Sequence, residues 1–103
     1  MNDLDDVATE LRRVVDRLNS LPLTKVEPLL PGCHEVAELI VARTRDLEPT
    51  MPADHALPTV GASAAGAQLA VVGRDYLAAL SQSPGADPSA VRDRLTELRR
   101  ALP

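Results

Sequence analysis

Residues 4–21 read LDDVATELRRVVDRLNSL, and this stretch decides the fold class of the chain. Its large apolar residues recur at alternating steps of three and four: Leu4, Val7, Leu11, Val14, Leu18 and Leu21. This spacing gives one apolar stripe along an α-helix, which needs a partner element to bury it. Acidic residues begin the segment and arginines follow toward its end, as the helix dipole favours. Pro22 then ends the predicted helix.

Three further segments have the same helical character. Residues 30–47 repeat the spacing, and residues 57–81 continue an apolar pattern as far as the Ser83, Pro84, Gly85 break. Asp87 and Pro88 are typical of an N-cap and a first-turn proline, and they open a last helix. Its stripe is Val91, Leu95, Leu98 and Leu102.

Prolines mark the connections between these helices. Pro22, Pro28 and Pro31 predict a connector with one short turn over residues 22–32, and Pro49, Pro52 and Pro58 bracket a loop. Short connections place sequence neighbours side by side, and alternation of period two is nowhere sustained. We therefore expect residues 1–103 to form one all-α domain, a small antiparallel bundle of about four helices.

The third helix is the unusual one, because residues 57–73 contain no charged residue. A helix that is apolar on nearly all sides is a buried helix. The run is too short and too weakly hydrophobic for a membrane span, so we expect no membrane association. Three amphipathic helices of so short a chain are not expected to cover it fully. We therefore predict a homodimer, with a contact edge formed by Ala62, Gly66, Leu69 and Gly73.

Composition narrows the class of function. The chain is 45% hydrophobic and 25% charged, which is ordinary for a folded protein, and its formal net charge of -4 opposes binding to nucleic acid. The alternative of a nucleic-acid-binding regulator would use Arg92, Arg99 and Arg100, but these alternate with acids and indicate a salt-bridged surface. The single Cys33 and an acidic start without an apolar leader favour a cytoplasmic protein, unless export needs no cleaved signal.

One short cluster is a candidate for chemistry. Residues 33–38 read CHEVAE, and His34 and Glu38 are four apart, so they face the same way on a helix. The string resembles the zincin motif H-E-x-x-H, with Glu38 in place of the second histidine. A zinc hydrolase would need a third ligand and a substrate cleft, and His55 is the only other histidine. The simpler interpretation is that His34 and Glu35 are solvated and Cys33 is a small core residue.

In its general format the chain resembles the small helical proteins associated with type VII secretion loci of high-GC bacteria. It is short, helical and rich in arginine, with Lys25 as the only lysine. It departs from that family's motifs, because it has no Trp for a W-x-G turn, and Leu80 stands where the export signature after Tyr76 requires an acid. We carry no functional residue over from this resemblance.

These observations favour a non-enzymatic helical interaction or adaptor protein that uses no cofactor and either self-associates or docks on a helical partner. The alternative is a bundle that binds a metal or small ligand, with a hydrolase as one form of it, centred on His34, Glu35 and Glu38.

Overall fold

The computed structural model describes residues 3–48 and 57–103, and the predicted loop around His55 lies mostly outside these ranges. Four long helices carry the fold, with three short elements between them. In chain order the elements are α1 (Asp3–Ser20), α2 (Leu23–Val26), η1 (Glu27–Leu29), α3 (Leu30–Leu47), η2 (Ala62–Ala64), α4 (Ala65–Ser81) and α5 (Ser89–Ala101). No strand occurs in the described ranges. The prediction of a small all-α helical bundle is confirmed.

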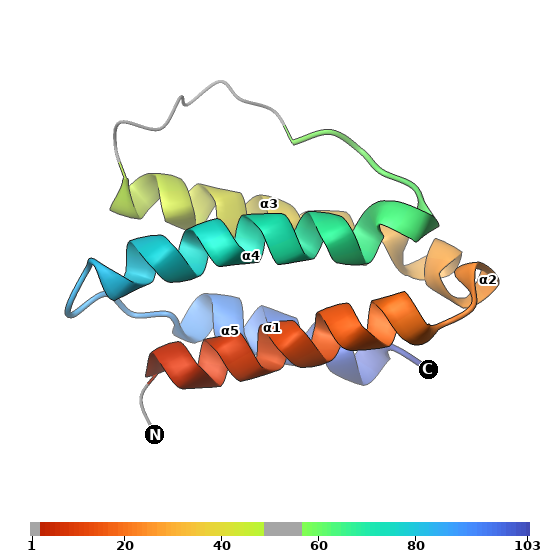
Figure 1. The fold of residues 1–103 in the computed structure, drawn as a ribbon, viewed down its shortest axis with the longest axis horizontal. Helices are drawn as coiled ribbons and strands as arrows, with labels where there is room; N and C mark the ends of the chain where they lie inside the picture. Colours follow the sequence, from red (N-terminus) through yellow and green to blue (C-terminus); the bar gives the residue numbers. More distant parts are fainter. Residues whose placement is uncertain (1–2, 49–56) are drawn as a thin grey trace.

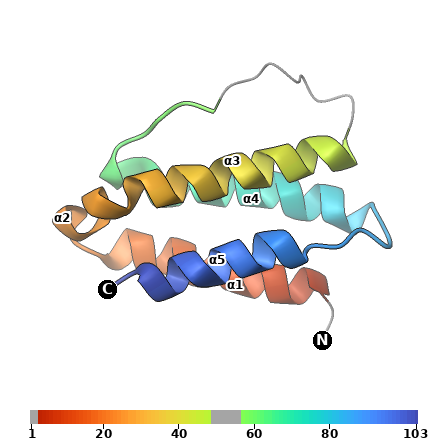
Figure 2. The same cartoon turned by 180° about the vertical axis from the view of Figure 1, so that it is seen from behind.

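The four long helices pack around a common core, but neighbours in sequence are not always neighbours in space. Each of α1 and α3 packs against both α4 and α5. Figures 1 and 2 show that α1 and α5 run in one direction and α3 and α4 in the other. The antiparallel contacts are therefore α1 with α4 and α3 with α5. The short α2 and η1 carry the chain from the end of α1 across to α3 at the same end of the bundle (Figure 1).

The core contains the predicted stripes of all four long helices. The buried cluster draws on α1 (Val7, Leu11, Val14, Leu18), α3 (Cys33, Val36, Ala37, Ile40), α4 (Leu69, Val72, Tyr76, Leu80) and α5 (Val91, Leu95, Leu98). The helix positions therefore follow the alternating steps of three and four in the sequence. Val26 of the short α2 is also fully buried, and it anchors the connector to the core.

The contact between α1 and α4 is close because two glycines of α4 lie under large side chains of α1. A Cβ added at Gly73 would lie 2.8 Å from Leu11 Cδ1, and one added at Gly66 would lie 3.5 Å from Leu18 Cβ. Leu11 and Leu18 are seven residues apart, as are Gly66 and Gly73. In an antiparallel pair this matched spacing places Leu11 over Gly73 and Leu18 beside Gly66, where Asn19 is the nearest side chain, and the two backbones can approach.

The start of α5 lies one residue later than the sequence signals predict, because the helix begins at Ser89 and Pro88, not Asp87, occupies the N-cap position. Asp87 Oδ1 accepts a hydrogen bond of 3.0 Å from the Ser89 backbone N–H, and this bond lowers the pKa of the Asp87 carboxyl. In the preceding turn Gly85 has a φ of 90°, a conformation that L side chains rarely adopt. Gly85 therefore lies in the turn between α4 and α5, and the Asp87 bond supports the first turn of α5.

Candidate functional site

The outward face of α4 is the main surface of functional interest. The opposite face of this helix is buried against α1 and α3, whereas Val71 remains 50% exposed and Ala67 is also exposed. No charged residue occurs in α4 before Arg74 and Asp75, which are exposed at the next turn. The outward face therefore begins as an uncharged surface of small and medium side chains and ends in an adjacent pair of opposite charges.

The edge predicted for a dimer contact lies elsewhere. Gly66, Leu69 and Gly73 are buried within the bundle, where Gly66 and Gly73 contact α1, and only Ala62 is partly exposed. In the folded chain these three residues pack within one bundle, and the expected contact edge stays a prediction. The physical reason for this packing is that the small side chains bring α1, not another molecule, close to α4. The homodimer itself stays a prediction.

The three residues of the predicted cluster, His34, Glu35 and Glu38, do not converge on one point, because His34 contacts Glu38 and Glu35 contacts a different helix. His34 Nε2 contacts Glu38 Oε1 one turn along α3, as the spacing of four predicts. Glu35 instead lies 3.6 Å from Arg94 of α5, measured between Oε2 and Nη2. Within residues 3–48 and 57–103, no group of three His, Cys, Asp or Glu residues could hold a metal ion. The arrangement offers a histidine held by a carboxylate, and Cys33 beside it is buried in the core.

A cavity of about 190 Å³ adjoins His34. Most of its lining residues belong to the beginnings of α3 and α4, which lie at the same end of the bundle (Figure 2). Its walls include Leu30 and Cys33 of α3, Ala65 of α4, and Val60 of the segment that precedes η2. His34 Nδ1 is buried and has no hydrogen-bond partner among the described residues. Sequence patterns gave no signal for this cavity, because its walls come from three separate parts of the chain.

Tyr76 is a core residue, as the sequence indicates, with only 3% of its surface exposed. It adjoins a second cavity of about 380 Å³, which Arg43, Asp46 and Asp87 also line. Burial raises the pKa of the Tyr76 hydroxyl, and the positive charge of Arg43 partly opposes that effect. The hydroxyl is therefore kept neutral, consistent with a structural tyrosine.

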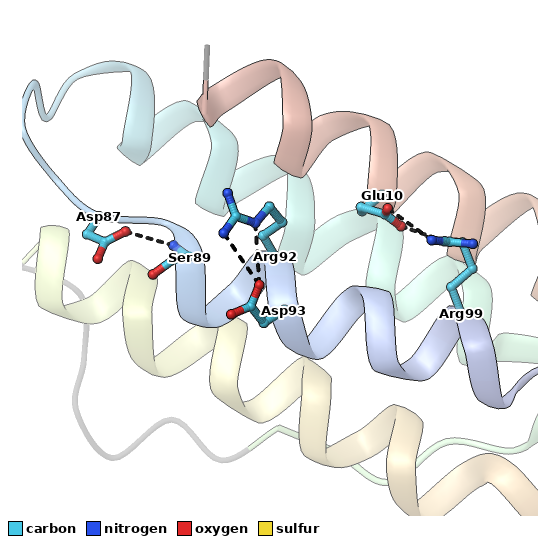
Figure 3. A network of polar contacts seen from close by, with 6 residues as sticks. All are labelled: Glu10, Asp87, Ser89, Arg92, Asp93 and Arg99. Atoms are coloured by element: carbon cyan, nitrogen blue, oxygen red, sulfur yellow. Dashed lines mark hydrogen bonds and ion pairs between the residues drawn. The ribbon is translucent and has the colours of Figure 1, made fainter. Parts of the chain in front are cut away.

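Three arginines of α5, Arg92, Arg94 and Arg99, are engaged with acids. Figure 3 shows Glu10 of α1 and Arg99 of α5 facing each other, with Arg99 Nε donating to Glu10 Oε2 at 2.7 Å. The same figure shows Arg92 beside Asp93, at 3.4 Å between Nε and Oδ1. The prediction of a salt-bridged surface is confirmed for these residues. The pair between Glu10 and Arg99 links two helices, and its partners are 89 residues apart in sequence, so no local pattern reveals it.

Comparisons of the chain with protein-family models, with curated proteins and with solved structures find no match. In the described part of the chain, no helix has both the length and the apolar character needed to cross a membrane.

Proposed function

We propose that this chain is a non-enzymatic helical interaction protein that docks a partner helix, from a second copy or from another protein, on the outward face of α4. The observation that carries the proposal is the half-exposed Val71, with exposed Ala67 one turn before it, on a stretch of helix without charge. Neither side chain belongs to the hydrophobic core cluster, so packing of the core does not explain why the exposed face is apolar.

The surface suits a helix because its side chains are small. Alanines at the contact let two helix axes approach closely and increase the number of dispersion contacts. Burying the exposed half of Val71 would contribute about 1 kcal/mol, and each neighbouring alanine would add less. Arg74 and Asp75 at the end of the surface would select the orientation of the partner through charge rather than add much affinity.

The test compares two glutamate substitutions of equally exposed apolar residues. Val71→Glu places a carboxylate in the proposed surface, and Leu23→Glu, at a residue 51% exposed on α2, is the matched control. Neither side chain is in the core, so both variants should keep the circular-dichroism spectrum and melting temperature of the wild type. Sedimentation velocity of all three proteins then measures self-association.

We expect the wild type to form dimers at micromolar concentration, Val71→Glu to weaken them at least about tenfold, and Leu23→Glu to leave them unchanged. If the wild type is monomeric, a photo-crosslinking residue at position 67 should capture one particular protein in its native host, and Val71→Glu should abolish that crosslink. A monomer whose position 67 captures nothing specific would refute the proposal.

A further inference from the structure

The cavity beside His34 is built separately from the outward face of α4. One wall is the first turns of α3, including Leu30, and another is the first turn of α4, including Ala65. The third wall is the segment before η2, including Val60. Gln68 Nε2 donates a hydrogen bond of 2.8 Å to Pro58 O, which fastens this segment to α4. Because this segment is bonded to α4, the cavity has a defined third wall.

The chemistry of the walls selects a neutral ligand. No Asp, Glu, Lys or Arg is among the described residues that line the cavity. Cys33 contributes an uncharged thiol, because burial raises its pKa. An ion in such surroundings would lose hydration without gaining an opposite charge. Leu30, Val60 and Ala65 instead favour apolar groups.

His34, Thr59 and Gln68 are the polar residues of the lining, and His34 is the one of the three with a buried atom that lacks a partner among the described residues. Its ring is held at Nε2 by Glu38. A neutral imidazole that donates its Nε2 proton to a carboxylate presents Nδ1 as a hydrogen-bond acceptor. This Nδ1 has no partner within the described ranges and is closed to a water-sized molecule, so a ligand reaches it only when the ring turns toward the cavity that His34 lines. A buried acceptor without a donor destabilises the structure that contains it, so a donor supplied from outside would be favoured.

The volume limits the size of the ligand. An apolar protein cavity of roughly 150 Å³ accommodates benzene. The cavity beside His34, at about 190 Å³, leaves room for one ring with a small substituent. A second fused ring or a long chain would have to extend outside.

We propose that this cavity binds a small neutral molecule of about one aromatic ring, whose single O–H or N–H group donates a hydrogen bond to His34. The binding site is independent of the docking surface on α4, because Val71 and Ala67 are not among its lining residues. Its occupant would be a compact hydroxylated or amine-bearing aromatic compound rather than a metal ion or an acid.

Three ring-sized probes test the proposal: phenol, toluene and benzoate. Titrations are followed through the methyl NMR signals of Leu30 and Val60, which line the cavity from different parts of the chain. We expect saturable shifts with phenol, weaker binding of toluene, which lacks the donor, and no saturation with benzoate, which is charged. The absence of saturation by phenol up to about 10 mM, a generous limit for a ligand of this size, would overturn the proposal.

Two variants locate the binding and identify the hydrogen bond. Val60→Trp fills the cavity from a half-buried position and should abolish phenol binding, whereas Val71→Trp adds the same bulk outside it and should not. His34→Leu removes the acceptor and should weaken phenol about three- to tenfold while leaving toluene unchanged. Equal affinity for phenol in wild type and Val60→Trp would refute the site, and equal losses of phenol and toluene in His34→Leu would refute the role of His34.

Discussion

The close contact between α1 and α4 yields a quantitative prediction about Gly73. Replacing glycine by alanine inside a helix ordinarily stabilises it by about 1 kcal/mol. At Gly73 the new Cβ would lie 2.8 Å from Leu11 Cδ1, closer than such atoms normally approach. Leu11 is only 8% exposed and its neighbours fill the core, so it cannot move aside freely. Overpacking of this kind costs about 1–3 kcal/mol, so Gly73→Ala should destabilise the protein by up to about 2 kcal/mol.

Two other glycines of the bundle provide matched controls. At Gly32 of α3 the nearest side-chain atom to an added Cβ is Leu98 Cδ1 at 3.9 Å, an ordinary contact. At Gly66 the added Cβ would crowd Asn19, whose exposed side chain can rotate away. We therefore expect Gly32→Ala to stabilise by up to about 1 kcal/mol and Gly66→Ala to be nearly neutral.

Urea unfolding of the three variants measures this order directly. Because both Gly32→Ala and Gly73→Ala gain helix propensity, the difference between them reports the packing cost alone, about 1–3 kcal/mol. In thermal unfolding each kcal/mol corresponds to about 4–8 °C for a domain of this size. The close approach would be refuted if Gly73→Ala stabilised the protein as much as Gly32→Ala does, or if combining it with Leu11→Ala revealed no coupling between the two sites.

Three further predictions concern single side chains. Leu11→Asp places a carboxylate in the core, and a loss of several kcal/mol is expected; an unchanged melting temperature would mean that the stripe of α1 faces solvent. The hydrogen bond from Arg99 lowers the pKa of Glu10 in the folded state, so the ionised carboxylate stabilises the fold above its ordinary pKa, and this contribution disappears as pH falls through the lowered value. Glu10→Gln should therefore lose less stability than wild type on acidification below about pH 4.5, and parallel pH profiles would contradict the pair. Asp87→Ala removes the acceptor of the Ser89 N–H, so amide hydrogen exchange should become faster in the first turn of α5 and stay unchanged in α1.

The sequence predicts the helices well because the apolar spacing that marks each core-facing stripe lies within the residues of that one helix. In α1 the spacing of Val7, Leu11 and Val14 defines the buried face without reference to any other helix. The beginning of α5 is equally local, since Asp87 acts on a backbone group two residues away. Features of this kind depend on neighbours within one or two turns, so a pattern along the chain is sufficient to find them.

The order in which helices contact one another cannot be found in the same way. Nothing in the stripe of α3 indicates that it packs beside a parallel α4 and an antiparallel α5, because any apolar stripe can pack against any other. The cavity beside His34 has the same limitation. Its walls at Leu30, Val60 and Ala65 meet only after the relative positions of α3 and α4 are set.

The sequence shows that α4 has more apolar surface than one buried face needs. It does not show which face of the helix stays exposed after the bundle has formed. Charged residues usually mark the solvent side of a helix, and residues 57–73 have none, so Gly66 and Val71 are equally eligible for a contact between molecules. The leucines of α1 resolve the choice, because Leu11 and Leu18 have the same spacing of seven as Gly73 and Gly66 and belong to the same chain. A tethered helix competes at an effective concentration of about millimolar, well above micromolar concentrations of a second copy. The glycine edge is therefore filled by α1 first, and Val71 is the large apolar side chain that α4 leaves exposed.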